Sequence, residues 1–165
     1  QLPIINISGN SVVCRDSVVN LKIANAIAGF EYDWGNGNMG VNYSPVITKD
    51  SVIRVTATDN TAQRCKATET YKVSIKENPI ITLNNDDPFV CKGDFVNISV
   101  TSNLPSSTYV WEGTSHENKT SSLKEKVDAN KEYKIYVTKD GCTASKDIKV
   151  SVWELPTVTA ESNRI

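Results

Sequence analysis

The chain has 165 residues and a formal net charge of −1, with 19 acidic and 18 basic side chains. This length allows one domain or two small ones. The even charge balance gives no sign of a surface built for nucleic acid or for an acidic membrane. The apolar runs are a few residues long, which excludes membrane insertion of this segment by a helix.

The composition favours strands over helices. There are 18 valines and 14 isoleucines but only 6 leucines and 1 methionine, and 15 threonines accompany 16 asparagines and 16 serines. β-branched residues prefer strands, and asparagine and serine prefer turns. We therefore expect an all-β protein.

Alternation of apolar and polar residues predicts the strands in chain order. In the first half they fall at 5–7, 19–23, 32–34, 53–57 and 71–75. In the second half they fall at 96–100, 109–111, 133–137 and 148–152. About seven short strands in ~77 residues are typical of an immunoglobulin-like β-sandwich.

The two halves are copies of one another. A shift of 77 residues aligns Val13-Cys14 with Val90-Cys91, Tyr32 with Tyr109, Trp34 with Trp111, and Cys65 with Cys142. Matches at cysteine and tryptophan, both rare residues, are not chance. The register slips only near 59–64, where the first copy carries extra residues in a turn.

The repeat sets the expected domain boundaries. X-Pro steps open the units at Leu2-Pro3, Asn78-Pro79 and Leu155-Pro156, and proline suits the start of an edge strand. We predict two tandem sandwiches at 1–78 and 79–155. Residues 156–165 resemble the opening strand, so we expect the start of a third repeat or a linker there, within a longer array.

The four cysteines form two equally spaced pairs. One bridge per unit, Cys14–Cys65 and Cys91–Cys142, is favoured because the other connectivities would cross between domains. A Cys₄ zinc site is the alternative, although no close pair of the C-x₂-C type is present. Disulfides would place the chain in an oxidising location, outside a cell or at its surface.

The aromatic residues divide into two groups by their phase along the strands. Four lie in phase with the apolar face and are predicted core residues: Tyr32, Trp34, Tyr109 and Trp111. Trp153 and Tyr136 fall on the opposite phase, so each is a possible interface or ligand contact. Tyr133 opens its strand as the tyrosine corner of Ig-type sandwiches does.

No constellation of catalytic residues stands out, and we expect no enzyme activity and no cofactor. His116 is the only histidine and lies in a polar stretch that reads as a surface loop. Asp86 and Asp87 are weak calcium candidates, because calcium needs six to eight oxygen ligands and chain neighbours cannot supply them all. Loops 35–43 and 113–122 are the expected places for any specific binding.

The order of these features resembles the Ig-like and PKD-like repeats that occur in tandem in very large surface proteins of Bacteroidetes. The segment at 32–37, YDWGNG, is similar to the W-D-F-G-D-G signature of PKD domains, whereas the second copy has YVWEG at 109–113. The resemblance implies a bacterial cell-surface or secreted array associated with the outer membrane.

The predicted function is that of a non-catalytic adhesin or spacer module. Its expected partners are neighbouring repeats of the same chain, and another surface protein or a glycan is a further possibility. The alternative is a carbohydrate-binding module of a secreted glycan-processing protein, with Trp153 the aromatic contact.

Overall fold

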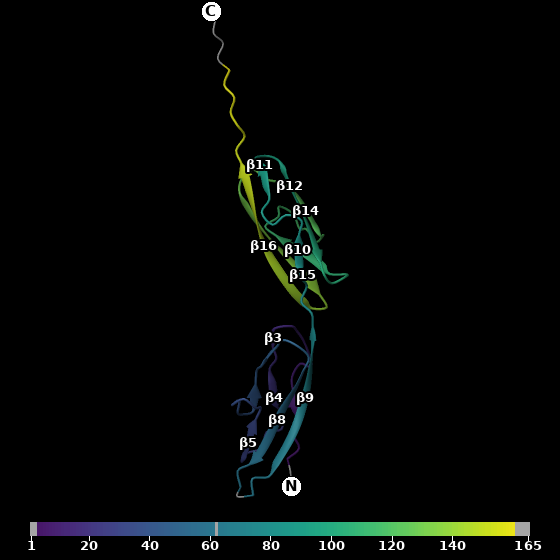
Figure 1. Ribbon diagram of the computed structural model, residues 1–165, viewed down its shortest axis with the longest axis vertical. Helices are drawn as coiled ribbons and strands as arrows, with labels where there is room; N and C mark the ends of the chain where they lie inside the picture. Colours follow the sequence, from purple (N-terminus) through teal and green to yellow (C-terminus); the bar gives the residue numbers. More distant parts are fainter. Residues whose placement is uncertain (1–2, 62, 161–165) are drawn as a thin grey trace, which may run out of the picture. The chain divides into compact units, whose positions relative to one another are not determined.

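The computed structural model describes residues 3–61 and 63–160, and every regular element in that part of the chain is a strand. The chain divides into two compact units, unit 1 at Gln1–Glu77 and unit 2 at Asn78–Ile165 (Figure 1). Residues 156–160 of the expected third repeat form no strand, and residues 161–165 lie outside the described part. The all-β prediction is confirmed.

Unit 2 is a sandwich of two sheets. Its seven strands are β10 (Ile81–Leu83), β11 (Phe89–Cys91), β12 (Phe95–Ser102), β13 (Thr108–Glu112), β14 (Ser122–Lys126), β15 (Lys131–Lys139) and β16 (Cys142–Trp153). One sheet has the order β10-β12-β14 and the other β11-β16-β15-β13. Every pair is antiparallel except β11 and β16, which run parallel. This strand order is that of a seven-stranded immunoglobulin-like sandwich.

Unit 1 repeats the plan with two of its strands broken into shorter pieces. Its strands are β1 (Ile7–Ser8), β2 (Val12–Cys14), β3 (Ser17–Val18), β4 (Leu21–Ile23), β5 (Phe30–Asp33), β6 (Asn42–Tyr43), β7 (Val46–Ile47), β8 (Ser51–Asp59) and β9 (Lys66–Lys76). The larger sheet has the order β2-β9-β8-β5, and the facing strands pair as β1-β4-β6 and β3-β7.

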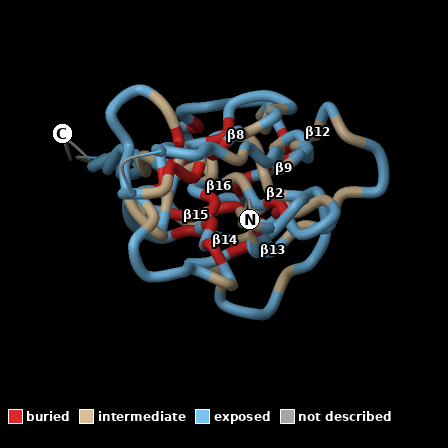
Figure 2. Tube along the Cα trace, turned by 90° about the horizontal axis from the view of Figure 1, so that it is seen from below, coloured by how far each residue is buried: buried red, intermediate tan, exposed pale blue. Residues whose placement is uncertain are grey.

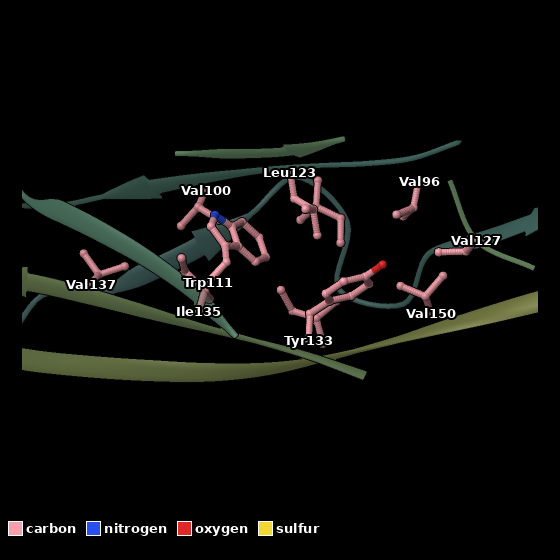
Figure 3. Close-up of a cluster of buried hydrophobic side chains, with 11 residues drawn as sticks. Val96, Val100, Trp111, Leu123, Val127, Tyr133, Ile135, Val137 and Val150 are labelled. Carbon is pink, nitrogen blue, oxygen red and sulfur yellow. The ribbon is translucent and has the colours of Figure 1, made fainter. Parts of the chain in front are cut away.

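The core of unit 2 comes from the inward positions of both sheets. Every second residue in the middle of β12 and of β15 is buried, as the period of two requires. Buried residues are drawn in red in Figure 2. Trp111 and Tyr133 are the largest side chains between the sheets, with aliphatic residues of both sheets around them (Figure 3). Val96, Ile98, Val100, Leu123, Val127, Ile135, Val137, Ile148 and Val150 complete the cluster.

Unit 1 fills the corresponding space differently. Tyr32 and Trp34 are buried, and the rings of Trp34 and Tyr43 stack with centroids 5.4 Å apart. Ile53 stands where unit 2 has Tyr133, and the second aromatic ring beside Trp34 is that of Tyr43 in β6. The remaining core residues are aliphatic: Ile5, Val19, Leu21, Ile23, Ile47, Val55, Ala57 and Val73.

The short strands β2 and β11 are the main difference from the sequence expectation. Each has three residues, too few to show an alternation. The register is the same in both units: Cys14 pairs with Lys76, and Cys91 pairs with Trp153, at a shift of 77. Each of the two cysteines is the last residue of its short strand. Because the pairing is parallel, each lies at the end of the unit where its last strand finishes.

Candidate functional site

The cysteines are the first candidate site, and their states differ from the expected ones. Cys14 and Cys142 are each disulfide-bonded, whereas Cys65 and Cys91 are free and exposed. The predicted bridges Cys14–Cys65 and Cys91–Cys142 are therefore wrong. Disulfide-bonded cysteines are nevertheless present, as an extracellular or surface protein would have.

Strand register explains why neither predicted bridge can form. Cys14 lies beside Lys76 at the end of the 11-residue strand β9, and Cys65 directly precedes the first residue of that strand. An extended strand rises about 3.3 Å per residue, so the two cysteines are about 36 Å apart. A disulfide joins Cα atoms about 4.4–6.8 Å apart. Cys91, beside Trp153, and Cys142 lie at opposite ends of β16 in the same way.

The buried tryptophans are structural and hold the later part of the two loops that were expected to bind. Trp34 Nε1 donates to the carbonyl of Gly40 at 2.9 Å, and Trp111 Nε1 donates to the carbonyl of Thr120 at 2.9 Å. Both side chains are buried, Tyr32 is buried as well, and Tyr109 is half-buried against the core. A buried indole needs a partner for its N–H. Each tryptophan therefore ties a loop to the sandwich core.

The loop at 35–43 is closed by its own hydrogen bonds. The Asp33 carboxylate accepts the Gly35 N–H at 2.7 Å, and the Asn38 amide donates to the Gly35 carbonyl at 3.0 Å. Met39 is exposed and pairs with Asp33 in an isolated bridge. These bonds fix the backbone of the loop and leave its outer side chains in water.

The loop at 113–122 forms a shallow polar hollow of about 190 Å³ that includes His116. His116 Nδ1 lies 3.1 Å from Ser115 Oγ, and both residues are exposed. Glu125, which lines the same hollow, accepts the Ser115 backbone N–H at 3.3 Å and the Lys131 ammonium at 2.5 Å. Glu125 therefore orients the loop and Lys131, and the imidazole is not held by it as a catalytic histidine would be.

Trp153 and Tyr136 lie on the outside, with different surroundings. Trp153 is 66% exposed, and Phe89, 59% exposed, lies on the neighbouring strand β11. Tyr136 is half-buried and donates its hydroxyl proton to Glu112 at 3.0 Å, with the Lys134 ammonium 5.9 Å from its ring. This hydrogen bond to Glu112 is the main reason that the pKa of Tyr136 is raised. The two aromatic rings do not form one platform, because they come from different positions of the sheet.

The calcium candidates are engaged in other contacts. Asp86 pairs with the Lys146 ammonium at 2.8 Å, and the backbone N–H of Asp87 donates to Asn85 at 3.2 Å. Across residues 3–61 and 63–160, no three acidic, histidine or cysteine side chains gather where they could hold a metal. The run at 84–87 is thus an Asx-rich turn.

A cluster that sequence reasoning missed lies beside Tyr133 in the core of unit 2. Glu125, 12% exposed, holds Lys131, and the Lys131 ammonium lies 5.0 Å from the ring centroid of Tyr133. The hydrogen bond to Glu125 raises the pKa of Lys131, and burial raises the pKa of Tyr133. Tyr133 Oη is buried without a hydrogen-bond partner among the described residues, so this tyrosine is not the hydrogen-bonded corner that was expected.

Comparisons with known proteins gave structural matches at low sequence identity. No protein-family model and no curated protein matches its sequence. Murine CEACAM1b is 16% identical with a TM-score of 0.35, covering 91% of this chain and 100% of that one. The amphioxus IgVJ-C2 molecule is 12% identical with a TM-score of 0.41, covering 85% and 99%. The N-terminal four Ig domains of Dscam1 isoform 6.9 are 10% identical with a TM-score of 0.40, covering 90% and 46%.

The structure of the chain itself gives its architecture and its relation to membranes. Within the described ranges there is no helix long and apolar enough to cross a membrane. The strand order and the core of each unit make both units immunoglobulin-like β-sandwiches, arranged in tandem along one chain and accompanied by a disulfide.

Proposed function

We propose that this chain is a non-catalytic extracellular repeat module, serving as a spacer or adhesive segment of a bacterial surface or secreted protein. The observation that carries the proposal is that both units repeat one arrangement of strands. In each unit the last strand pairs in parallel with a three-residue strand that ends in cysteine, in the same register. Repeats that preserve core and register while their loops differ suit a scaffold.

The proposed boundaries follow the repeat. We place the two modules at 1–78 and 79–155, and we assign 156–165 to the start of a third repeat or a linker. The sequence resemblance to Bacteroidetes surface arrays supports the bacterial origin, and the disulfide supports an oxidising compartment. Neighbouring repeats are then the first partners of each module.

Force spectroscopy on the full chain, held by its two ends, tests the spacer role. After reduction we expect two separate unfolding events, each releasing about 25 nm, because each unit contains roughly 77 residues or slightly more and extended chain spans about 3.3–3.6 Å per residue. Featureless extension of the reduced chain would contradict the proposal.

Carbohydrate binding is the second candidate, favoured by the exposure of Trp153 beside Phe89. Aromatic faces bind sugars through stacking, so loss of the ring should abolish such binding. A glycan array with the full chain decides the question when Trp153→Ala and Tyr136→Ala are compared. Binding that Trp153→Ala abolishes and Tyr136→Ala preserves would replace the spacer proposal with the lectin one.

A further inference from the structure

We propose that the outer face of β12 and β14 in unit 2 binds an acidic saccharide, that is, a sugar chain that carries carboxylate or sulfate groups. The proposal gives the adhesive role of the proposed function a site and a ligand class, and in that respect it rests on the proposed function. The site lies within one unit and does not include Trp153.

The site consists of three pairs of residues that face one another across β12 and β14, which run antiparallel side by side (Figure 1). Directly opposite residues of such a pair lie on the same face, with Cβ atoms about 4.5–5.5 Å apart. All six side chains are exposed, whereas the residues between them within each strand point inward. The pairs are Phe95 with Lys126, Asn97 with Lys124, and Ser99 with Ser122.

The charge of this face is uncompensated. Lys124 and Lys126 form no ion pair with any residue that the structure describes, and none of the six side chains is acidic. Glu125 lies between the two lysines in sequence but faces the other side of β14, where it binds Lys131 at 2.5 Å. Each of the other lysines of unit 2 pairs with a carboxylate: Lys92, Lys119, Lys131, Lys134, Lys139, Lys146 and Lys149. Charge complementarity therefore requires an anionic ligand at Lys124 and Lys126.

The groups beside the lysines suit the hydroxyls of a sugar. The Asn97 amide and the hydroxyls of Ser99 and Ser122 make no hydrogen bond with other described residues. With Asn84 they line a hollow of about 260 Å³. The side-chain oxygen of Asn84 accepts the Ser99 N–H at 2.7 Å, which holds the Asn84 amide at the rim of this hollow. Amides and hydroxyls both donate and accept hydrogen bonds, as the hydroxyls of a sugar do.

Phe95 supplies the apolar part of the site. Its side chain is 53% exposed, and the Lys124 ammonium lies 5.3 Å from the ring centroid. An exposed ring beside a positive charge can pack against the C–H face of a sugar while the ammonium contacts an acidic group on it. A simple anion or a membrane phosphate would use the ammonium groups and leave the ring and the amide without a role. The combination therefore favours a saccharide.

Unit 1 lacks the corresponding site. The counterparts of the first two pairs are Val18 with Val46 and Asn20 with Ser44. Neither pair carries a charge, and the Asn20 side-chain oxygen already accepts the Ser44 hydroxyl at 2.8 Å. The two units share a strand plan but differ on this face, so we expect unit 2 to bind and unit 1 not to bind.

A glycan array with the full chain is the first test, with chains that contain uronic acid, sialic acid or sulfate and with their neutral counterparts. We expect binding to acidic chains and none to the neutral counterparts. Binding to no acidic chain, or equal binding to the neutral ones, would overturn the proposal. Polyphosphate of similar charge is the second probe. If it binds as tightly as the best acidic chain and Phe95→Ala leaves both affinities unchanged, the site captures charge alone and the saccharide proposal fails.

Calorimetry with the best acidic chain of the array then places the site. Lys124→Gln and Lys126→Gln should each weaken binding about tenfold, and Phe95→Ala about fivefold. Lys149→Gln is the matched control, because it removes the same charge from the other sheet of unit 2 and should leave the affinity unchanged. Binding that survives the loss of both Lys124 and Lys126 would overturn the proposal. Unfolding under force does not depend on these exposed side chains, so failure of the spacer role is seen separately.

Discussion

Replacing Tyr133 with phenylalanine should stabilise unit 2. The side chain is 1% exposed, and its hydroxyl oxygen has no hydrogen-bond partner among the residues that the structure describes. Figure 3 shows this oxygen pointing toward Val127 and Val150, which offer it nothing polar. Leaving a buried polar group unpaired costs about 1–3 kcal/mol. Tyr133→Phe removes the group and keeps the ring, so we expect a gain of that order.

Tyr32→Phe is the matched control in unit 1. Tyr32 is also buried, but its hydroxyl accepts the Ile27 N–H at 2.9 Å. Losing that bond leaves the N–H unpaired, and we expect unit 1 to lose about 1 kcal/mol. Hydrogen–deuterium exchange read separately on β15 and β5 measures each unit. Slower exchange in β15 for Tyr133→Phe, by about fivefold or more, supports the reasoning. Faster exchange would refute it by showing that the hydroxyl has a partner.

The same residue predicts a loss of stability at high pH. Burial raises the pKa of Tyr133 in the folded chain above its ordinary value near 10. Above pH 10 the unfolded chain loses this proton while the folded chain keeps it, so stability falls as pH rises. Tyr133→Phe has no such proton. The stability difference between the variant and the native chain should therefore widen above pH 10 and stay constant from pH 6 to 9.

Three further variants or conditions test other parts of the structure. Gly113→Ala should destabilise unit 2 by about 3 kcal/mol, because a Cβ would lie 2.5 Å from the Glu132 carbonyl at a φ of +85. Gly37 has a φ of +80, but a Cβ there would meet open space, so Gly37→Ala should lower the free energy of unfolding of unit 1 by only about 1 kcal/mol. Equal losses for the two variants in thermal unfolding would contradict the packing argument. Trp111→Phe removes the hydrogen bond to Thr120 and should lower the stability of unit 2 by about 2–3 kcal/mol. Trp153 is exposed, so Trp153→Phe should change stability by less than about 0.5 kcal/mol. Calcium or a chelator should leave the Tm unchanged, because Asp86 is paired with Lys146. A rise in Tm with calcium would instead support a calcium site at Asp86 and Asp87.

Alternation and self-similarity predicted the sandwiches because both signals come from buried side chains. Val19, Leu21 and Ile23 alternate with polar neighbours in the sequence and are buried in the structure. The same logic failed for β14, whose five residues include only one buried apolar side chain, Leu123. It also failed for Tyr133, where the sequence pattern matched a hydrogen-bonded tyrosine but the nearby polar groups bind one another.

The disulfide could not be predicted for a reason that concerns strand direction. A cysteine at the end of a three-residue strand can lie at either end of a sandwich, depending on whether that strand pairs parallel or antiparallel with its neighbour. The residues of β2 and β11 are compatible with both directions, and only the sheet order decides between them. Once the pairing with β9 and β16 is parallel, the two cysteines of one unit are about 36 Å apart. A repeat in sequence shows that two cysteines are equivalent, but it does not show that the two cysteines of one repeat lie close enough to form a bond.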